Sequence, residues 1–286
     1  MLYGLRERTI PYLRDMKYDI DVLKRVTYLI IGVGNLGTRV LDNLARLPHN
    51  KIILVDHDIV GEENVGYQDL YQPSDIGKGK VYAARDRIME KYPWAKIEIY
   101  YRSIPDAIED TGDELSSNIL KGQFNFLDEL IQRTDITLIT LDAATARLSP
   151  WIVSIKRDKP FIDIGYQENF GNIFLWISGY PCPLCFIKSL KIKYDRTYYA
   201  DPILVEIVTA IASKMAVDYV NKKVSESLKI EVYNYNTTVN KVAPQECKHY
   251  KEIKSIEINE YLEIMRKIYK EKFKQATTRY SKKPFS

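Results

Sequence analysis

The chain has 286 residues, of which 45% are hydrophobic, and its formal net charge is +4. This length suits one large or two modest domains, and the apolar content is enough to fill a core. Apolar runs stay well short of the roughly 18 residues that a membrane span needs, and the charges spread through the first 20 residues do not fit a signal peptide. We therefore expect a cytoplasmic protein without a membrane-spanning segment.

The charged residues and the cysteines narrow the class further. The basic excess is concentrated after Lys248, in a segment that otherwise reads as a solvated helix with a ragged end. Nucleic-acid binding would need a basic face on a folded motif, so we do not expect it here. Three cysteines are an odd number, which argues against a disulfide scaffold and favours a reducing compartment with a metal or redox role.

The first elements along the chain are an arm and one strand–helix–strand unit. Residues 1–25 include several arginines and no clear strand, which predicts an N-terminal helical arm. Apolar runs at Tyr28–Ile31 and Lys51–Asp56 predict strands, and apolar residues at helical spacing between them predict a helix over 35–47. Residues 57–73 lack periodicity, which predicts a long loop of the kind that is usually functional.

The pattern of elements in the rest of the chain changes at Gly165. Before it, we expect helix 79–91, strand 97–101, a loop with a short helix over 105–122, helix 124–132, strand 136–141, helix 145–157 and strand 161–164. Strands that alternate with helices predict a doubly wound, mostly parallel α/β sheet of the Rossmann type. After Gly165 we expect strand 171–178, a hinge-like segment 186–200, helix 202–220, strand 229–235 and a terminal helix 256–274.

A glycine motif, Gly-Val-Gly-Asn-Leu-Gly, joins the first strand to the first helix. Gly32 permits a tight turn, Gly34 lets the backbone approach a phosphate, and Gly37 allows close packing of the helix on the strand. Free N–H groups at the helix N-terminus can hold an anion. Asp56 follows Gly32 by 24 residues, about where an acid that binds a ribose belongs. The motif predicts a nucleotide site, but it fits a nicotinamide or flavin enzyme as well as an ATP site.

The segment after the second strand separates these classes. It reads Asp56-His57-Asp58, then Glu63-Asn64 with Gln68, then Asp75-Ile76-Gly77-Lys78-Gly79-Lys80. In this order and spacing the chain resembles the ThiF/MoeB/HesA adenylyltransferases, whose core is shared with ubiquitin-activating enzymes. The Leu141–Arg147 turn and the C-x-x-C at Cys182 and Cys185 are similar to further motifs of that family. A nicotinamide-dependent oxidoreductase would leave Lys80 and the C-x-x-C unexplained.

The resemblance covers roughly residues 6–250 and implies an organisation for the chain. It implies a nucleotide-binding adenylation domain over residues 26–250, with a zinc-bearing antiparallel extension. A C-terminal helix and basic tail over 251–286 follow. By the same resemblance a second copy of the chain contributes an arginine to the site, so we expect a homodimer. Arg8 is the best match for that arginine, and Arg6 stays open beside it.

The resemblance also implies roles for the motif residues. Those expected to bind ATP are Gly32, Gly34, Asn35, Gly37, Asp56, Asp58, Asn64, Gln68 and Lys80. Among them, Asp56 would bind the ribose and Lys80 would act in catalysis, while Asp142 would help to hold Mg²⁺. A carboxylate that attacks the α-phosphate is already anionic and needs no general base. The site must therefore supply alignment and positive charge, which Lys80 and Mg²⁺ can provide.

Plainer interpretations of three of these residues stay open at this stage. Lys80 could be a surface lysine at a helix start, and Asp142 could cap the helix that follows it. His57 is best interpreted as a spacer between two carboxylates. The chain also departs from the family pattern, because Tyr67 stands where a phosphate-contacting arginine is expected and Ala143 where an asparagine is expected. A phenol carries no charge near neutral pH, so altered or lost turnover is an alternative.

The cysteines predict a metal site. Cys182 and Cys185 have the spacing of half a tetrahedral zinc site. The second half is incomplete in sequence, but Cys247 and His249 could supply the remaining ligands. Buried or redox-active cysteines are the alternative. By the resemblance a thioester-forming cysteine would stand near Ala200–Asp201, where the chain has none.

Taken together, these patterns predict an ATP-dependent adenylyltransferase. It would activate the C-terminal carboxylate of a small ubiquitin-like or sulfur-carrier protein without a covalent thioester step. A catalytically degenerate relative that still binds nucleotide and a protein partner is the main alternative. A peptide or an RNA-linked carboxylate stays open as the target, and segments 105–122 and 186–200 are where we expect substrate choice to lie.

Overall fold

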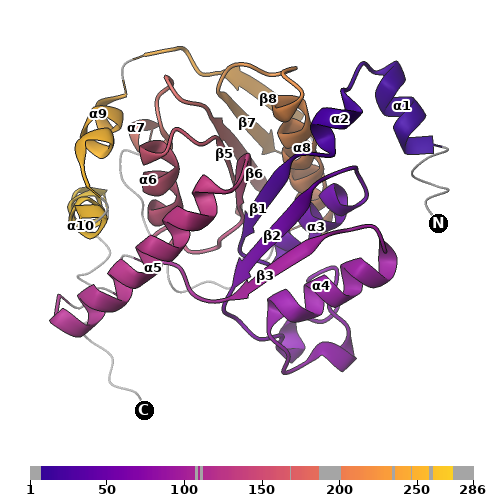
Figure 1. The fold of residues 1–286 in the computed structure, drawn as a ribbon, viewed down its shortest axis with the longest axis horizontal. Helices are drawn as coiled ribbons and strands as arrows, with labels where there is room; N and C mark the ends of the chain where they lie inside the picture. The colour runs from indigo at the N-terminus through magenta and orange to yellow at the C-terminus, as the bar shows by residue number, and fades with distance from the viewer. Residues whose placement is uncertain are drawn as a thin grey trace.

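A computed structural model describes residues 8–106, 109, 112–167, 169–186, 201–233, 236–245, 247–257 and 260–272. One eight-stranded sheet runs through it, in the order β3-β2-β1-β4-β5-β6-β7-β8 (Figure 1). The first five strands in sequence pair in parallel, and the last three join as antiparallel neighbours. The doubly wound, mostly parallel α/β class with an antiparallel extension is therefore confirmed. Most of the predicted segment 186–200, like Arg6, lies outside the described residues.

The first strand–helix unit forms as its sequence pattern predicts. Its elements are β1 (Thr27–Ile31), α3 (Asn35–Ala45), β2 (Lys51–Asp56), α4 (Lys80–Lys91) and β3 (Ile97–Tyr101). All five residues of β1 are buried, because the strand is covered by helices on both faces. Two short 3₁₀ turns, Glu62–Asn64 and Pro73–Asp75, fold the long loop between β2 and α4.

One helix in the middle of the chain is longer than the sequence indicates. Residues 105–122 were expected to be a loop with a short helix before a helix over 124–132, but α5 runs unbroken over Glu114–Gln132. The Asp113 carboxylate caps it by accepting a hydrogen bond from the Ser116 N–H. The first turns of α5 are solvated, and even their apolar residues Leu115 and Ile119 are exposed, so no buried apolar face marks the helix before Leu120. The expectation was wrong because periodicity shows only where a helix face is buried.

The remaining parallel strands and their helix lie close to their predicted positions. These elements are β4 (Ile136–Ile139), α6 (Leu148–Lys156) and β5 (Phe161–Gln167). The antiparallel part consists of β6 (Phe170–Trp176), β7 (Leu228–Tyr233) and β8 (Asn236–Lys241), with α8 (Pro202–Val220) crossing between β6 and β7. The sequence does not reveal β8, because every residue of this edge strand is exposed and no alternation marks it.

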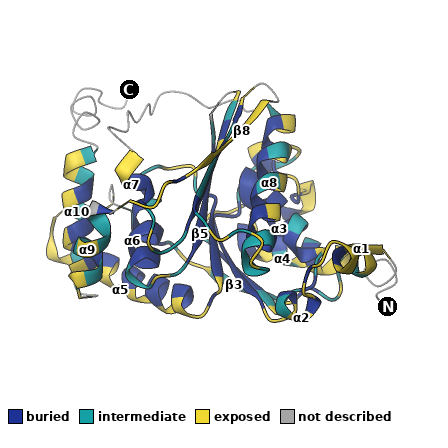
Figure 2. Ribbon diagram, turned by 90° about the horizontal axis from the view of Figure 1, so that it is seen from above, coloured by how far each residue is buried: buried dark blue, intermediate teal, exposed yellow. Residues whose placement is uncertain are grey.

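The C-terminal region also differs from its expectation. A single helix over 256–274 was predicted, but the described residues form α9 (Lys248–Ser255) and α10 (Tyr261–Lys272). Both helices pack against the layer that α5 and α6 form on one face of the sheet, because Ile253, Tyr261 and Met265 are buried in the same core as those two helices. Figure 2 shows this layer on one face of the sheet and α3, α4 and α8 on the other.

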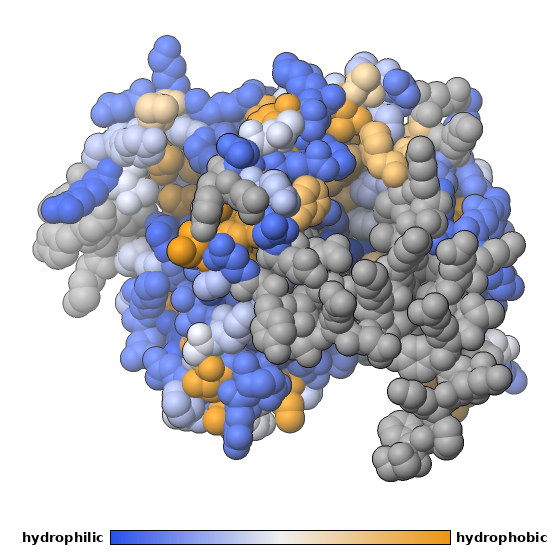
Figure 3. All heavy atoms as spheres, turned by 180° about the vertical axis from the view of Figure 1, so that it is seen from behind, coloured by the Kyte–Doolittle hydropathy of each residue, from blue (hydrophilic) through white to orange (hydrophobic). Residues whose placement is uncertain are grey.

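Two short helices precede β1, and the second of them packs against α8. α1 (Ile10–Asp15) extends outward from the body, and α2 (Ile20–Leu23) follows it (Figure 1). The Asp19 side chain caps α2 by accepting from the Asp21 and Val22 N–H groups. Viewed from behind, the described surface is mostly hydrophilic, with apolar side chains in scattered patches (Figure 3). A search of the described residues finds no helix of the length and apolar character that crossing a membrane requires.

Candidate nucleotide and metal sites

The glycine turn sits at the carboxyl end of β1, where the sheet order branches to β2 on one side and β4 on the other. Gly32 has φ +92°, and its N–H donates to the Val55 carbonyl over 2.9 Å. The Thr140 hydroxyl donates to the Gly32 carbonyl over 2.6 Å. A Cβ at Gly37 would stand 2.0 Å from the Gly32 oxygen, so only glycine lets the helix start this close to the strand. This is the crevice in which open α/β sheets hold ligands.

Asp56 holds the turn together at the end of β2. One carboxylate oxygen accepts from the Val33 N–H at 2.6 Å, and the other accepts from the Asp58 N–H at 2.8 Å. Burial raises the pKa of Asp56, while these N–H bonds and the charge of Lys80 act against the rise. The carboxylate is therefore placed beside the glycine turn by two independent bonds.

Lys80 lies inside the site and not on the surface. It is the first residue of α4 and only 8% exposed. Its Nζ lies 2.8 Å from Asp58 Oδ2, and its N–H donates to the Asp58 carbonyl over 2.9 Å. The interpretation of Lys80 as a surface lysine is therefore wrong. His57, between the two carboxylates, is largely exposed, as expected of a spacer.

The loop after β2 folds over the glycine turn. Asn64 is buried, and its Oδ1 accepts from the Gly61 N–H over 2.9 Å, so this atom stabilises the loop. The Gln68 amide nitrogen lies 4.0 Å from the position of a Cβ on Gly34, and its buried Oε1 has no hydrogen-bond partner among the described residues. Because orphaned buried acceptors are rare in proteins, this atom fits a ligand donor, such as an adenine amine. The Tyr71 hydroxyl donates to the Val33 carbonyl over 2.6 Å, a contact that no sequence motif indicated.

Tyr67 takes part in a phenol pair at the mouth of the site. Its hydroxyl lies 3.1 Å from that of Tyr166, near the end of β5. Burial and the bond to Tyr166 raise the pKa of Tyr67 to about 12, while interactions with Asn35 and Arg39 act in the other direction. Tyr67 therefore stays a neutral donor at physiological pH.

Asp142 is exposed on the loop that follows β4. Its Oδ1 accepts from the Ala143 N–H over 2.7 Å. The next helix begins only at Leu148, so the interpretation of Asp142 as a helix cap is wrong. Arg147 from the same turn donates to Asp163 over 2.9 Å and to the Leu141 carbonyl, and it fixes the loop against β5.

Arg8 is exposed and precedes α1. This helix extends from the body of its own chain (Figure 2). The described residues therefore leave open whether Arg8 reaches a nucleotide site, and its role across a dimer stays a prediction.

The four predicted metal ligands come together on the opposite side of the sheet from α3 and α8. Cys182 immediately precedes α7 (Pro183–Phe186) and Cys185 lies within it, while Cys247 and His249 lie at the start of α9. Their donor atoms all lie within 4.8 Å of one another. The nearest separations are 3.9 Å for Cys182–Cys185, 3.6 Å for Cys185–Cys247 and 3.5 Å from His249 Nδ1 to the Sγ of Cys182 and of Cys185.

These distances fit a single tetrahedral metal ion. Metal–sulfur bonds of about 2.3 Å place two tetrahedral sulfurs roughly 3.8 Å apart. Hydrogen bonds with Cys185 and Cys247 raise the pKa of His249 to about 9, and bonds with Cys182 and Cys185 lower the pKa of Cys247. Without a metal the cluster thus favours an imidazolium beside a thiolate. The three-sulfur, one-nitrogen donor set is the chemistry of a structural zinc site.

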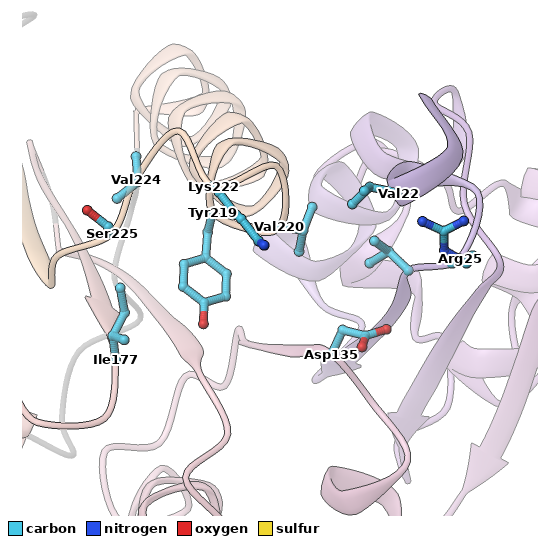
Figure 4. A pocket seen from close by; sticks show the side chains of 10 residues that line it. Val22, Arg25, Asp135, Ile177, Tyr219, Val220, Lys222, Val224 and Ser225 are labelled. Carbon is cyan, nitrogen blue, oxygen red and sulfur yellow. The ribbon is translucent and has the colours of Figure 1, made fainter. Parts of the chain in front are cut away.

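A hollow of about 640 Å³ lies far from these two sites in the fold. Val26 and Asp135, which precede β1 and β4, line it together with Tyr219 and Lys222 at the end of α8 (Figure 4). It therefore opens at the amino ends of the parallel strands, and the glycine turn lies at their carboxyl ends. We assign the nucleotide site from the turn geometry and not from this hollow.

The strand–glycine turn–helix, the acid after β2 and the buried Lys80 place the chain among α/β proteins with the turn typical of nucleotide-binding folds. The model of the ThiF family matches residues 9–257, so the chain belongs to the ThiF family. This membership confirms the resemblance seen in the motifs.

Three known proteins illustrate the similarity. The chain is 29% identical over 144 residues to ubiquitin-like modifier-activating enzyme ATG7 of Sordaria macrospora, which is 49% of this chain and 20% of that protein. It is 38% identical over 78 residues to the probable molybdopterin-synthase adenylyltransferase of Porphyra purpurea, which is 27% of this chain and 20% of that protein. Escherichia coli MccB with ATP shares the fold with a TM-score of 0.65 and 17% identity, over 80% of this chain and 67% of that one. The matched region is therefore about a fifth of the length of both curated relatives.

Proposed function

We propose that the protein activates the C-terminal carboxylate of a small ubiquitin-like or sulfur-carrier protein by ATP-dependent adenylation. The observation that carries the proposal is the buried Lys80, which pairs with the exposed Asp58 beside the glycine turn that Asp56 fixes. In a nicotinamide site no charge develops on the pyrophosphate during the reaction, so the buried cation would stay unexplained. An ATP site requires one, because negative charge spreads over the phosphates as the reaction proceeds.

In the proposed reaction a carboxylate oxygen attacks the α-phosphorus of ATP, and the bond to the bridging oxygen of the β-phosphate breaks. The products are an acyl-adenylate and pyrophosphate. The turn residues Gly32, Gly34, Asn35 and Gly37 would hold the phosphates at the N-terminus of α3, and Asp56 would bind the ribose. Gln68 would contact the base, while Asn64 and Asp58 would keep the loop and Lys80 in place. Asp142 would hold Mg²⁺, which supplies further positive charge at the phosphates.

We further propose that the chain works without a thioester intermediate. All three of its cysteines lie in the metal-ligand cluster, so a thiol bound there is not available as a nucleophile. The bound metal would be structural zinc, held by Cys182, Cys185, Cys247 and His249. Thiol ligands must stay reduced, which is consistent with a cytoplasmic protein. A homodimer in which Arg8 of one copy completes the site of the other belongs to the same proposal.

Pyrophosphate exchange tests this function directly. The protein, ATP, Mg²⁺ and labelled pyrophosphate are incubated with a panel of candidate carriers that end in Gly-Gly, and with the same carriers lacking the last two residues. We expect label to enter ATP only with an intact carrier. Pretreatment with zinc should leave the exchange unchanged. A folded protein that exchanges with none of the carriers, and with none of a set of free-carboxylate peptides, would contradict the proposal.

One observation favours a second function, the binding of nucleotide and partner without turnover. Tyr67 is neutral and pairs with Tyr166, and this loop provides no cation of its own. Calorimetry with ATP separates the two functions. Binding that is followed by neither AMP nor pyrophosphate, with any carrier, would identify the protein as a binding module.

A further inference from the structure

A buried guanidinium lies directly behind the proposed phosphate-binding turn. Arg39 belongs to α3 and is only 9% exposed, and its helix neighbours Leu36 and Val40 pack in the apolar core. A charged side chain is unusual in such surroundings. Its side chain points back along the helix toward the first turn. There Nη1 donates to the Asn35 carbonyl over 3.0 Å and also to the Asn35 side-chain oxygen. Since arginine does not lose its proton in proteins, this is a fixed positive charge under the turn.

The charge of Arg39 is only partly compensated. Its carboxylate partner is Glu206 on α8, which bonds to Nε. The Glu206 side chain is 55% exposed while that of Arg39 is 10% exposed. Water screens the exposed carboxylate more strongly than the buried guanidinium. A positive potential is therefore left on the side of Arg39 that faces Asn35 and the N-terminus of α3, where the helix dipole has the same sign.

The loop over the glycine turn contains no lysine or arginine that could place positive charge at the phosphates. Between Asp56 and Lys78 the sequence contains no lysine or arginine, but it contains Asp58, Glu62, Glu63, Asp69 and Asp75. Lys80 follows this loop, and its partner Asp58 is 52% exposed, so the charge of Lys80 is only partly compensated, in the same way as that of Arg39. Because the loop itself is acidic, a nucleotide triphosphate bound here would gain from the charge of Arg39 in addition to that of Lys80.

Asn35 links the guanidinium to the start of α3. Its side-chain oxygen accepts from Arg39, so its amide nitrogen faces away from the guanidinium. Tyr67 belongs to the loop at the mouth of the site, where its hydroxyl lies 3.1 Å from that of Tyr166, and both Asn35 and Arg39 act to lower the pKa of Tyr67. Both Asn35 and Tyr67 can therefore present N–H and O–H donors to a phosphate, polarised by the cation behind them.

We propose that Arg39 is a positioning residue that supplies positive charge to the phosphates of ATP through Asn35 and Tyr67. Arg39 touches neither the substrate nor the reacting atoms in this arrangement. It orients Asn35 and strengthens the anion-binding end of α3, which compensates for the neutral phenol at position 67. This inference rests on the proposed ATP-binding function and adds to it the source of the charge.

Binding measurements with and without phosphates test the inference. The affinities of ATP and of adenosine are measured for the wild-type chain, Arg39→Met and the matched control Arg46→Met. Arg46 lies at the other end of α3 and pairs with Asp42. We expect Arg39→Met to weaken ATP binding by about tenfold or more, as for a lost charge-assisted bond, and to leave adenosine binding unchanged. Arg46→Met should leave both unchanged.

A second substitution provides the rescue. In the double variant Arg39→Met with Tyr67→Arg, the cation returns to the same turn from the loop side, and ATP affinity should recover most of the loss. Glu206→Gln removes the opposing charge, so it should keep or increase ATP affinity. This variant retains the buried arginine and serves as the test if Arg39→Met does not fold.

The outcomes separate this inference from the function on which it rests. A wild-type chain that binds no ATP contradicts the proposed function itself. A wild-type chain that binds ATP, together with an Arg39→Met variant of equal ATP affinity, overturns only the inference. Equal losses of ATP and adenosine affinity would show that Arg39 merely supports the fold, and they would also overturn it. A lower ATP affinity in Glu206→Gln would contradict it in the same way.

Discussion

The nucleotide turn and the metal cluster are built in opposite ways. The turn comes from one continuous stretch, Gly32 to Lys80, and backbone N–H groups hold its key carboxylate Asp56. The cluster joins Cys182 and Cys185 to Cys247 and His249 across an intervening helix and two strands. The atoms that meet in the cluster are the side-chain Sγ and ring nitrogen atoms of these four residues. A site fixed by local backbone bonds is preorganised without its ligand, whereas a site assembled from distant side chains depends on the ion that it holds.

The charged groups of the two regions also depend on their ligands to different degrees. In the turn, Lys80 and Arg39 each have one carboxylate partner, and the partners' side chains are 52% and 55% exposed, so both positive charges are only partly compensated without a ligand. In the cluster, thiols and an imidazole crowd together and shift one another's pKa values. Metal binding would relieve this crowding, because ligand thiols bind as thiolates and the imidazole binds neutral. We therefore expect the two regions to respond independently to substitutions.

The largest effect is expected from Gly37→Ala. The new Cβ would stand 2.0 Å from the Gly32 carbonyl oxygen, which forces the helix away from the strand and opens the turn. We expect no measurable ATP binding by calorimetry, while the metal content of the purified protein stays the same. Gly122→Ala is the control, because a Cβ there meets nothing within 4 Å and the residue lies inside α5. Loss of bound metal in Gly37→Ala would show that the two regions are coupled.

Removal of one metal ligand should affect the other region alone. Cys185→Ser, at an exposed position of the cluster, should lower the zinc content from one ion per chain to near zero, measured by elemental analysis. We expect a lower thermal midpoint, because α7 and α9 lose the ion that joins them, and an unchanged ATP affinity. His57→Ala is the control, since His57 is exposed and outside the cluster. If Cys185→Ser still holds one zinc ion per chain, Cys185 is not a ligand and this ligand set is wrong.

Lys80→Met is expected to reduce turnover without loss of the fold. Removal of one preorganised charge at the phosphates should decrease the rate of carrier-dependent pyrophosphate exchange by about 10²–10³-fold. The matched control is Lys78→Met, which removes a lysine that is 51% exposed and pairs with Asp75. The rate of that variant should stay within a few fold of wild type. If both variants lose the same activity, the effect comes from general charge and not from the position of Lys80.

The smallest effect concerns how pH changes the stability of the parallel part of the sheet, where Glu98 lies on β3. Burial would raise the pKa of Glu98, but bonds from Lys51, Tyr100 and Arg133 outweigh it and lower the pKa to about 2. The folded pKa lies below the ordinary value of 4.5, so this carboxylate stabilises the fold above that value and loses the contribution as the pH falls toward 2. Glu98→Gln should cost about 1 kcal/mol at pH 7 after solvent screening.

Denaturant unfolding between pH 7 and pH 3 measures this difference. The gap between wild type and Glu98→Gln should begin to close below about pH 4.5, as protonation of Glu98 sets in. Glu252→Gln on α9 is the control. The ion pair of Glu252 with Lys267 is exposed, so it should contribute little to stability at any pH. A gap that is constant over the whole range would contradict the assignment.

The sequence by itself was sufficient for the nucleotide turn. Its chemistry depends on neighbours in the chain: glycines that must be glycine, a carboxylate at the end of the next strand, and a lysine at the start of the next helix. Strand and helix periodicity predicted β1, α3 and β2 because the sheet buries them. The same reasoning missed β8, which is exposed throughout, and it shortened α5, whose first turns are solvated.

Only the tertiary structure decided what distant side chains do. The sequence offered Cys247 and His249 as partners of the C-x-x-C but left buried or redox-active cysteines open, because the second half of the site has an irregular spacing. Only the fold brings the four donor atoms within 4.8 Å of one another. Arg39 looks like an ordinary helix residue until α8 places Glu206 beside it and its guanidinium donates back to Asn35. The physical reason is the range of the interactions. Backbone geometry follows from local sequence, whereas burial and charge compensation depend on which elements the fold brings together.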